Sequence, residues 1–98
     1  MKTRPRLDSI HAEVVEMFRR CGDPVLSLAA LGNGVSDLLV NHRGTLHLVE
    51  VKTGLKSKLR PAQQRFFCEW PVHVCRSADD ALALVRAWDR DTRHAGGI

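Results

Sequence analysis

The sequence lacks a long apolar run. None of its 98 residues belong to a stretch approaching the roughly 20 apolar residues that a membrane-spanning helix needs. The basic segment 1–7 is not followed by an apolar stretch, so we expect no secretory signal. With 44% hydrophobic and 27% charged residues, the composition is typical of a globular protein. We therefore expect one domain over 1–98, located in the cytoplasm and not bound to a membrane.

Cysteines are few and widely spaced. The three cysteines are Cys21, Cys68 and Cys75, an odd number with no CxxC pair. This spacing excludes a disulfide framework and a zinc site of the CxxC type. We predict that each cysteine is a small buried hydrophobic residue.

Acidic residues are absent between Glu50 and Glu69. The basic residues in that interval are Lys52, Lys56, Lys58, Arg60 and Arg65. With a net charge of +4 and a pI near 9.4, this run favours an anionic partner such as a phosphate backbone. A solvated loop without a function is the alternative.

Periodicity and turn residues predict a small α/β domain of order αβββαβα. Apolar residues at helical spacing, with capping residues and Pro61, predict helices over 7–20, 61–69 and 78–88. Apolar and β-branched runs predict strands over 25–30, 35–41, 46–52 and 72–76. Because two of these strands are apolar on both faces, we expect a sheet that is covered on two sides. The core spans about 8–88, and we expect a flexible tail over 89–98.

The central hairpin carries charged residues that packing alone does not predict. A turn at 42–45 places Leu39 opposite Leu48 and Asp37 opposite Glu50. Lys52 then points to the same face as Glu50. Opposed like charges are destabilising, and a divalent cation is the simplest group to offset them. The alternative is a solvated strand end in which Lys52 forms an ordinary salt bridge.

A hard cation at this position suits phosphodiester hydrolysis. Mg²⁺ takes few protein carboxylates and favours sites that also receive phosphate oxygens. Asp37 and Glu50, with the main-chain carbonyl of Val51, are the expected metal ligands. Lys52 is suited to position the attacking water or to stabilise charge on the phosphate.

Three ordered segments resemble a known nuclease superfamily. They are GVSDLLV over 34–40, LVEVKT over 48–53 and LRPAQ over 59–63. The set of Asp, Glu-X-Lys and a following Pro-X-Gln resembles the PD-(D/E)XK nucleases, and more narrowly their virus-type replication-repair branch (VRR-NUC). The resemblance covers about 8–88 and implies a restriction-endonuclease-like αβββαβ core, a small mixed sheet with flanking helices. One departure is Ser36, where the family usually has proline.

The resemblance implies an Mg²⁺- or Mn²⁺-dependent endodeoxyribonuclease. It suggests Asp37 and Glu50 as metal ligands, Lys52 as the catalytic lysine and Gln63 as a helix residue near the phosphate, with Gln64 as the alternative. It also implies a site residue on the first helix. Glu13 is our choice, with Glu16 and His11 as alternatives. Lys56, Lys58, Arg60 and Arg65 are expected to contact DNA.

The resemblance further suggests branched DNA as substrate, such as four-way (Holliday) junctions or flaps in DNA repair, and a homodimer of bacterial or phage origin. Two alternatives remain open. One is a catalytically silent nucleic-acid-binding module. The other is a subunit that needs a larger partner, docked through an apolar surface around Phe66, Phe67 and Trp70.

Overall fold

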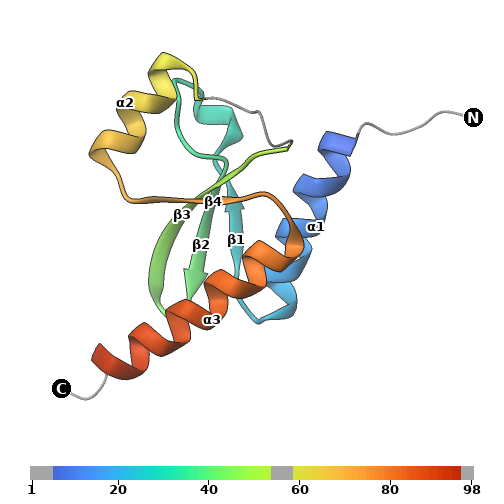
Figure 1. The fold of residues 1–98 in the computed structure, drawn as a ribbon, viewed down its shortest axis with the longest axis vertical. Helices are drawn as coiled ribbons and strands as arrows, with labels where there is room; N and C mark the ends of the chain where they lie inside the picture. The colour runs from blue at the N-terminus through green and yellow to red at the C-terminus, as the bar shows by residue number, and fades with distance from the viewer. Residues whose placement is uncertain (1–5, 54–58, 96–98) are drawn as a thin grey trace, which may run out of the picture.

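The chain forms a four-stranded mixed sheet with three helices (Figure 1). The computed structural model describes residues 6–53 and 59–95, and the side chains of 9–53 and 59–91. The helices are α1 (Arg6–Arg20), α2 (Pro61–Glu69) and α3 (Ala78–Ala95), with a 3₁₀ turn η1 (Ala29–Leu31). The strands are β1 (Val25–Ser27), β2 (Leu38–His42), β3 (Thr45–Val51) and β4 (Val72–Cys75). The order β1-β2-β3-β4, with β4 parallel to β3 and the other pairs antiparallel, confirms the predicted α/β fold with a mixed sheet.

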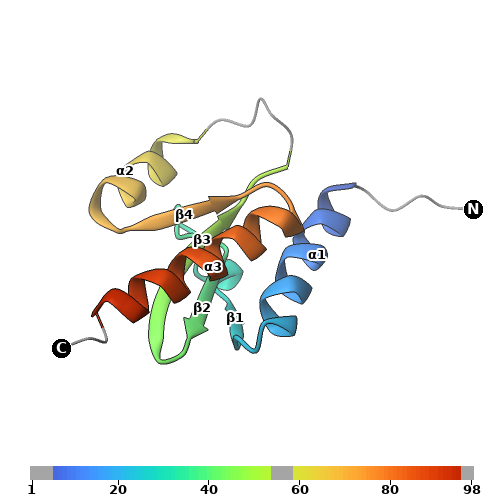
Figure 2. The same cartoon turned by 60° about the horizontal axis from the view of Figure 1, so that its bottom comes forward.

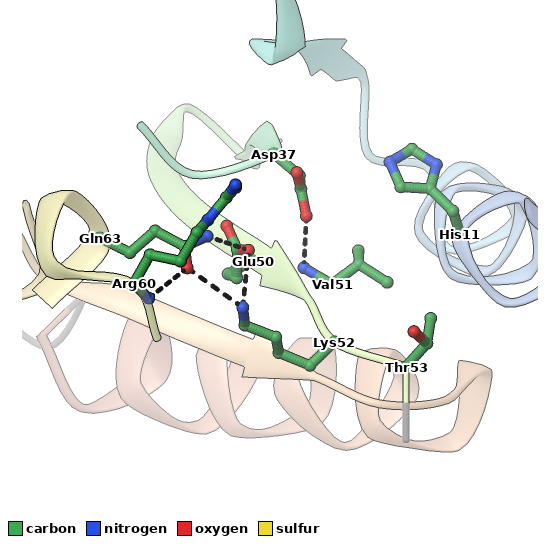
Figure 3. A pocket seen from close by; sticks show the side chains of 8 residues that line it. All are labelled: His11, Asp37, Glu50, Val51, Lys52, Thr53, Arg60 and Gln63. Atoms are coloured by element: carbon green, nitrogen blue, oxygen red, sulfur yellow. Dashed lines mark hydrogen bonds and ion pairs between the residues drawn. The ribbon is translucent and has the colours of Figure 1, made fainter. Parts of the chain in front are cut away.

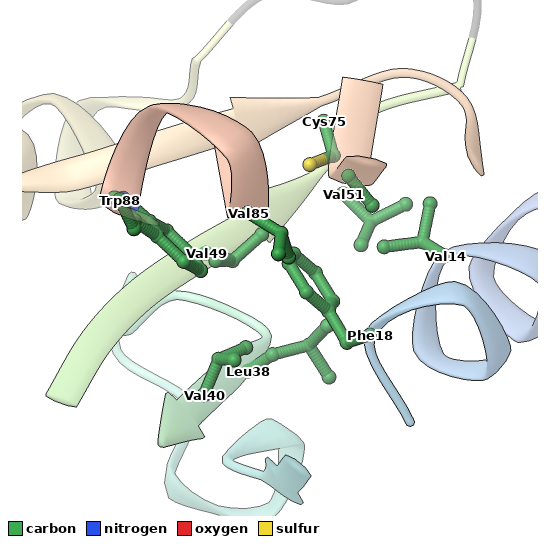
Figure 4. Packing of buried hydrophobic residues seen from close by; sticks show 10 residues of the cluster. Val14, Phe18, Leu38, Val40, Val49, Val51, Cys75, Val85 and Trp88 are labelled. Atoms are coloured by element: carbon green, nitrogen blue, oxygen red, sulfur yellow. The ribbon is translucent and has the colours of Figure 1, made fainter. Parts of the chain in front are cut away.

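Helices α1 and α3 lie side by side over one face of the sheet (Figures 1 and 2). The hydrophobic core lies between them and the strands (Figure 4). Its largest members are Phe18 of α1 and Trp88 of α3, whose rings stack at 5.8 Å. The other core residues are Val14, Leu38, Val40, Val49, Val51, Cys75, Ala81 and Val85. The core packs against one face of β2 and β3, and the charged side chain of Glu50 lies on the opposite face.

The other face of the sheet is covered only in part. Val49 and Val51 point into the core, so Glu50 between them points to the opposite face, where Gln63 of α2 contacts it. Elsewhere on that face Leu26, Leu46 and Val74 are exposed. The expectation of a sheet covered on two sides is therefore wrong here, because two of the three helices pack on the same face.

The central hairpin has the predicted register, with Leu39 opposite Leu48. The first strand of this hairpin, β2, is shorter than the strand predicted over 35–41. It begins only at Leu38, because the residues from 32 to 37 form a loop. Gly34 in this loop has a φ of +81° and lies against the start of α2. An added Cβ would lie 2.5 Å from the Ala62 carbonyl carbon, so only glycine permits this approach. The loop leading to Asp37 is thus fixed against α2.

Helix α3 begins as predicted and ends later than expected. Ser77 Oγ accepts a hydrogen bond of 3.1 Å from the Asp80 N–H, as expected of an N-cap. The helix then continues to Ala95, so the segment 89–95 is helical. One physical reason is Asp89, whose Oδ1 lies 2.8 Å from His42 Nε2. His42 is buried and its Nδ1 also contacts Asp23, so one side chain ties α3 to the hairpin and to the end of α1.

The three cysteines differ in burial. Cys75 is buried in the core, and burial raises the pKa of its thiol to about 12. Cys21 is half-buried, whereas Cys68 is exposed, so the prediction of a buried residue is wrong for Cys68. Its place on the outer side of α2, which contacts the rest of the fold mainly through Gln63, accounts for this exposure. Within the described ranges, no helix combines the length and the apolar character needed to cross a membrane.

Candidate active site

Two carboxylates meet where β2 begins and β3 ends (Figure 3). Asp37 immediately precedes β2, and Glu50 is the penultimate residue of β3. Asp37 Oδ2 accepts a 2.8 Å hydrogen bond from the Val51 N–H, which fixes the Asp37 carboxylate against the neighbouring strand. The other Asp37 oxygen is left to face the pocket that both acids line. The hairpin register predicted from the sequence brings these two acids together.

One carboxylate oxygen of Glu50 is fixed by contacts, whereas the other has no hydrogen-bond partner among the described residues. The residue is only 4% exposed, and its Oε2 accepts a 3.0 Å hydrogen bond from Gln63 Nε2. Lys52 Nζ lies 3.6 Å from the same oxygen. The Oε1 atom is buried and has no hydrogen-bond partner among the described residues. Burial, and secondly the nearby Asp37 carboxylate, raise the pKa of Glu50 although Lys52 acts against them. Lys52 therefore offsets the burial of Glu50 and its repulsion from Asp37 only in part.

Gln63 organises the basic side of the site. It is buried in the first turn of α2, where Pro61 starts the helix. Its Oε1 accepts hydrogen bonds from Lys52 Nζ at 3.3 Å and from the Arg60 N–H at 3.0 Å, while its Nε2 donates to Glu50. The neighbouring Gln64 is exposed and donates to the Leu59 carbonyl instead. The geometry thus places Gln63, and not Gln64, in the site, a choice that the sequence left open.

These residues line one pocket of about 270 Å³. Its lining residues are His11, Asp37, Glu50, Val51, Lys52, Thr53, Arg60 and Gln63 (Figure 3). Five of the expected site residues and the expected DNA-contacting Arg60 are among them. Thr53 was given no role, although it is the last residue of the LVEVKT segment that resembles the nuclease motif.

The first helix contributes His11 to this pocket, not Glu13. Glu13 is exposed and lines a separate hollow with Glu16, which pairs with Arg20 at 3.1 Å. Helical geometry explains the difference. His11 is three residues before Val14 on the buried stripe of α1, whereas Glu13 lies about 200° further round the helix. If the helical spacing of the apolar residues had also been used to place the polar residues, it would have put His11, and not Glu13, next to the buried face of α1.

The expected DNA-contacting residues are placed only in part. Arg60 is exposed beside the pocket, and Arg65 is exposed on α2. Lys56 and Lys58 lie outside the described residues. Of the basic residues that the structure describes, Lys52 and Arg60 line the pocket.

The donor set of the pocket fits a hard divalent cation. The donors are the buried Glu50 oxygen that has no partner in the described part of the chain, the Asp37 carboxylate and the Val51 carbonyl. These are the oxygen ligands that such cations prefer. No group of three or more His, Cys, Asp or Glu residues within the described ranges is arranged to hold a metal ion. The fit is accordingly that of an ion held by two carboxylates that keeps several of its waters, as Mg²⁺ does.

Comparisons with known proteins agree with this geometry. The sequence matches no protein-family profile, and no curated protein is recognisably similar to it. A solved structure described as a VRR_NUC domain is similar in fold, with a TM-score of 0.68 and 27% sequence identity. The alignment covers 85% of this chain and 97% of that one. Together with the Asp, Glu-X-Lys and Pro-X-Gln motif in one pocket, this similarity supports a nuclease-type domain like that of the VRR_NUC structure.

Proposed function

We propose that the protein is a metal-dependent endonuclease that hydrolyses phosphodiester bonds in DNA. The observation that carries the proposal is the buried Oε1 of Glu50, which has no hydrogen-bond partner among the described residues and lies beside Asp37 in a pocket that also holds Lys52 and Gln63. A binding surface alone has no use for two opposed carboxylates, since they repel both each other and a phosphate backbone. With a cation between them, the same pair attracts phosphate oxygens.

Asp37, Glu50 and the Val51 carbonyl would hold Mg²⁺ or Mn²⁺. When bound, the cation would polarise the scissile phosphate and lower the pKa of a coordinated water. The Val51 N–H keeps Asp37 in place for this role, and Gln63 keeps Glu50 in place. The main-chain hydrogen bond from Lys52 N–H to the Cys75 carbonyl, 2.9 Å long, anchors the strand end that carries these groups.

Lys52 is proposed to position the attacking water and to stabilise negative charge that develops at the phosphate. Its ammonium lies between Glu50 Oε2 and Gln63 Oε1, which fixes it at the pocket wall without burying it fully. A fixed ammonium can stabilise the additional negative charge of the transition state more than that of the ground state. Arg60 and Arg65 are proposed to hold the neighbouring phosphates of the strand, together with Lys56 and Lys58.

The preferred substrate is proposed to be branched DNA, such as a four-way junction or a flap met in DNA repair, in a bacterial or phage-infected cytoplasm. We propose a homodimer for this purpose, because a two-fold pair of sites suits the cleavage of two symmetric strands. The exposed Leu26, Leu46 and Val74 on the outer sheet face offer apolar area for such an interface.

The test is a cleavage assay with a panel of DNA structures. Wild-type protein and the Asp37→Asn variant are incubated with linear duplex, single-stranded, flap and four-way-junction DNA, with Mg²⁺, Mn²⁺ or EDTA. Asparagine retains an oxygen that accepts the Val51 N–H, so the variant keeps its fold and loses a charged ligand. We expect metal-dependent cutting by the wild type and at least about a 10³-fold loss in the variant.

Other outcomes assign other functions. Salt-sensitive DNA binding without cutting at any metal concentration supports a silent binding module. No cutting by the chain alone, but cutting after a larger partner is added, supports a subunit role. Equal cutting by Asp37→Asn and wild type contradicts the proposed site.

A further inference from the structure

His11 lines the pocket, but the proposed function gives it no role. It reaches the pocket from α1, whereas the ammonium of Lys52 gathers with Arg60 and Gln63 on the other side of the carboxylates (Figure 3). Its side chain is half-buried, and no hydrogen bond or ion pair joins its ring to another described residue. A polar ring at a pocket wall with no internal partner is available to whatever enters the pocket.

The geometry argues against His11 as a metal ligand. His11, Asp37 and Glu50 do not form a three-membered ligand group, and neither does any other such trio in the described part of the chain. The imidazole therefore stands apart from the two carboxylates across the pocket. The volume of about 270 Å³ is several times the roughly 30 Å³ share of one water molecule, so it has room for a phosphodiester group with waters.

Apart from His11, the basic residues that line the pocket are poorly suited to release a proton. Arginine does not deprotonate in proteins, and Lys52 Nζ contacts Glu50 Oε2 and Gln63 Oε1. Breaking a phosphodiester bond leaves an alkoxide on the departing sugar, which needs a proton. Imidazole is the side chain that most often supplies one near neutral pH.

We propose that His11 is the general acid of the reaction, an inference that rests on the proposed nuclease function. The water oxygen forms a bond to phosphorus, and the bond from phosphorus to the departing sugar oxygen breaks with its electron pair on that oxygen. The imidazolium N–H of His11 passes its proton to this oxygen, giving an alcohol. The proton lost by the attacking water goes to solvent, and solvent returns one to His11. Lys52 and His11 on different walls match the opposite positions of entering and leaving oxygens.

The test uses DNA in which sulfur replaces the bridging oxygen at the cleaved phosphate. A thiolate is a much more stable anion than an alkoxide and leaves without a proton. His11→Ala and His11→Gln are compared with wild type under single turnover with Mn²⁺, on normal DNA and on 3′- and 5′-bridging phosphorothiolates. We expect a loss of about 10²–10⁴-fold on normal DNA and less than about 10-fold on the phosphorothiolate with sulfur at the leaving position. Lys52→Met should slow both substrates alike.

Matched controls separate this role from others. Ser9→Ala, an exposed change on the same helix, should leave both rates unchanged, and Glu13→Gln discriminates the two first-helix candidates. Mn²⁺ titration followed by electron paramagnetic resonance should give the same affinity for His11→Ala and wild type, since His11 is not a ligand. Equal losses on oxygen and sulfur substrates, a weakened Mn²⁺ affinity, or a loss confined to Glu13→Gln would overturn the proposal. If wild type cuts and Asp37→Asn does not, the proposed function stands whatever His11 does. If wild type cuts no DNA, both fail.

Discussion

Replacing Glu50 with glutamine should stabilise the cation-free fold and destroy the metal site. Glutamine keeps the volume of the side chain and an oxygen for the Gln63 Nε2 donor. It removes the charge of a buried carboxylate whose Oε1 has no partner among the described residues. Asp37, Glu50 and Lys52 together carry a net charge of −1, and the substitution makes this cluster neutral.

The magnitude follows from two opposed contributions. An unsatisfied buried polar group costs about 1–3 kcal/mol and a charged one costs more; because the glutamine amide also leaves one polar atom unpaired at this position, the gain is the difference between the two. The lost pairing of Glu50 with Lys52, at 3.6 Å, offsets about 0–1 kcal/mol of the gain. We expect a net increase of about 1 kcal/mol in the free energy of unfolding, or about 4–8 °C in Tm for a domain of this size.

The pH dependence of this gain has a definite sign. An acid whose pKa is raised by folding destabilises the fold as the pH rises above its ordinary value of 4.5. The advantage of Glu50→Gln over wild type should therefore be full above the raised pKa of Glu50 and shrink as the pH falls toward 4.5. A neutral glutamic acid and a glutamine then contribute alike.

Thermal unfolding with and without Mg²⁺ or Mn²⁺ is the assay. A cation at about 100 times its Kd stabilises the wild type by about 2.7 kcal/mol, and the variant should gain little. The order of the two proteins should thus reverse when the cation is added. Glu69→Gln, an exposed change on α2, serves as the control and should alter nothing. A variant that is less stable without cation, or stabilised as much as wild type with it, would refute the reasoning.

Three further predictions concern the support of the site. Gly34→Ala should cost about 1–3 kcal/mol and displace the start of α2, because the added Cβ meets the Ala62 backbone at a φ of +81°; an unchanged urea midpoint contradicts this. His42→Ala should cost about 3–5 kcal/mol, since it leaves the buried Asp23 carboxylate without its partner; a loss below about 1 kcal/mol in urea unfolding would show that the contact is dispensable. Burial lowers the pKa of His47 and of His73 in the fold. These two groups therefore do not reduce the free energy of unfolding above about pH 6.5, and they reduce it increasingly as the pH drops below that value. The double variant His47→Gln/His73→Gln should have a smaller difference in urea midpoint between pH 7.5 and pH 5 than wild type, and an equal difference argues against this cause.

The site was more predictable from the sequence than its surroundings. Turn residues and alternation were enough to set the hairpin register, and this register alone brings Asp37 to Glu50 and Lys52. The motif favoured Gln63 and left Gln64 open as the alternative. The choice between them depends on which face of the short helix α2 meets the sheet, a tertiary property.

The errors have a common physical origin in packing between distant segments. The open outer face of the sheet results from α1 and α3 sharing one face, which strand composition does not reveal. The extension of α3 past Trp88 depends on the pairing of Asp89 with His42, 47 residues away in the chain. The preference for Glu13 over His11 differs, because the helical spacing of the apolar residues of α1 already places His11 nearer to the buried face.

The central claim is that Asp37, Glu50 and Lys52 form a metal-dependent centre for phosphodiester hydrolysis. The most direct test is single-turnover cleavage of a labelled four-way junction by wild type and by Lys52→Met, each with Mn²⁺ and with EDTA. The account predicts cutting by the wild type with Mn²⁺ alone, and a loss of about 10²-fold or more in the variant at unchanged DNA affinity. Cutting that persists in EDTA, or that Lys52→Met leaves unchanged, would contradict it.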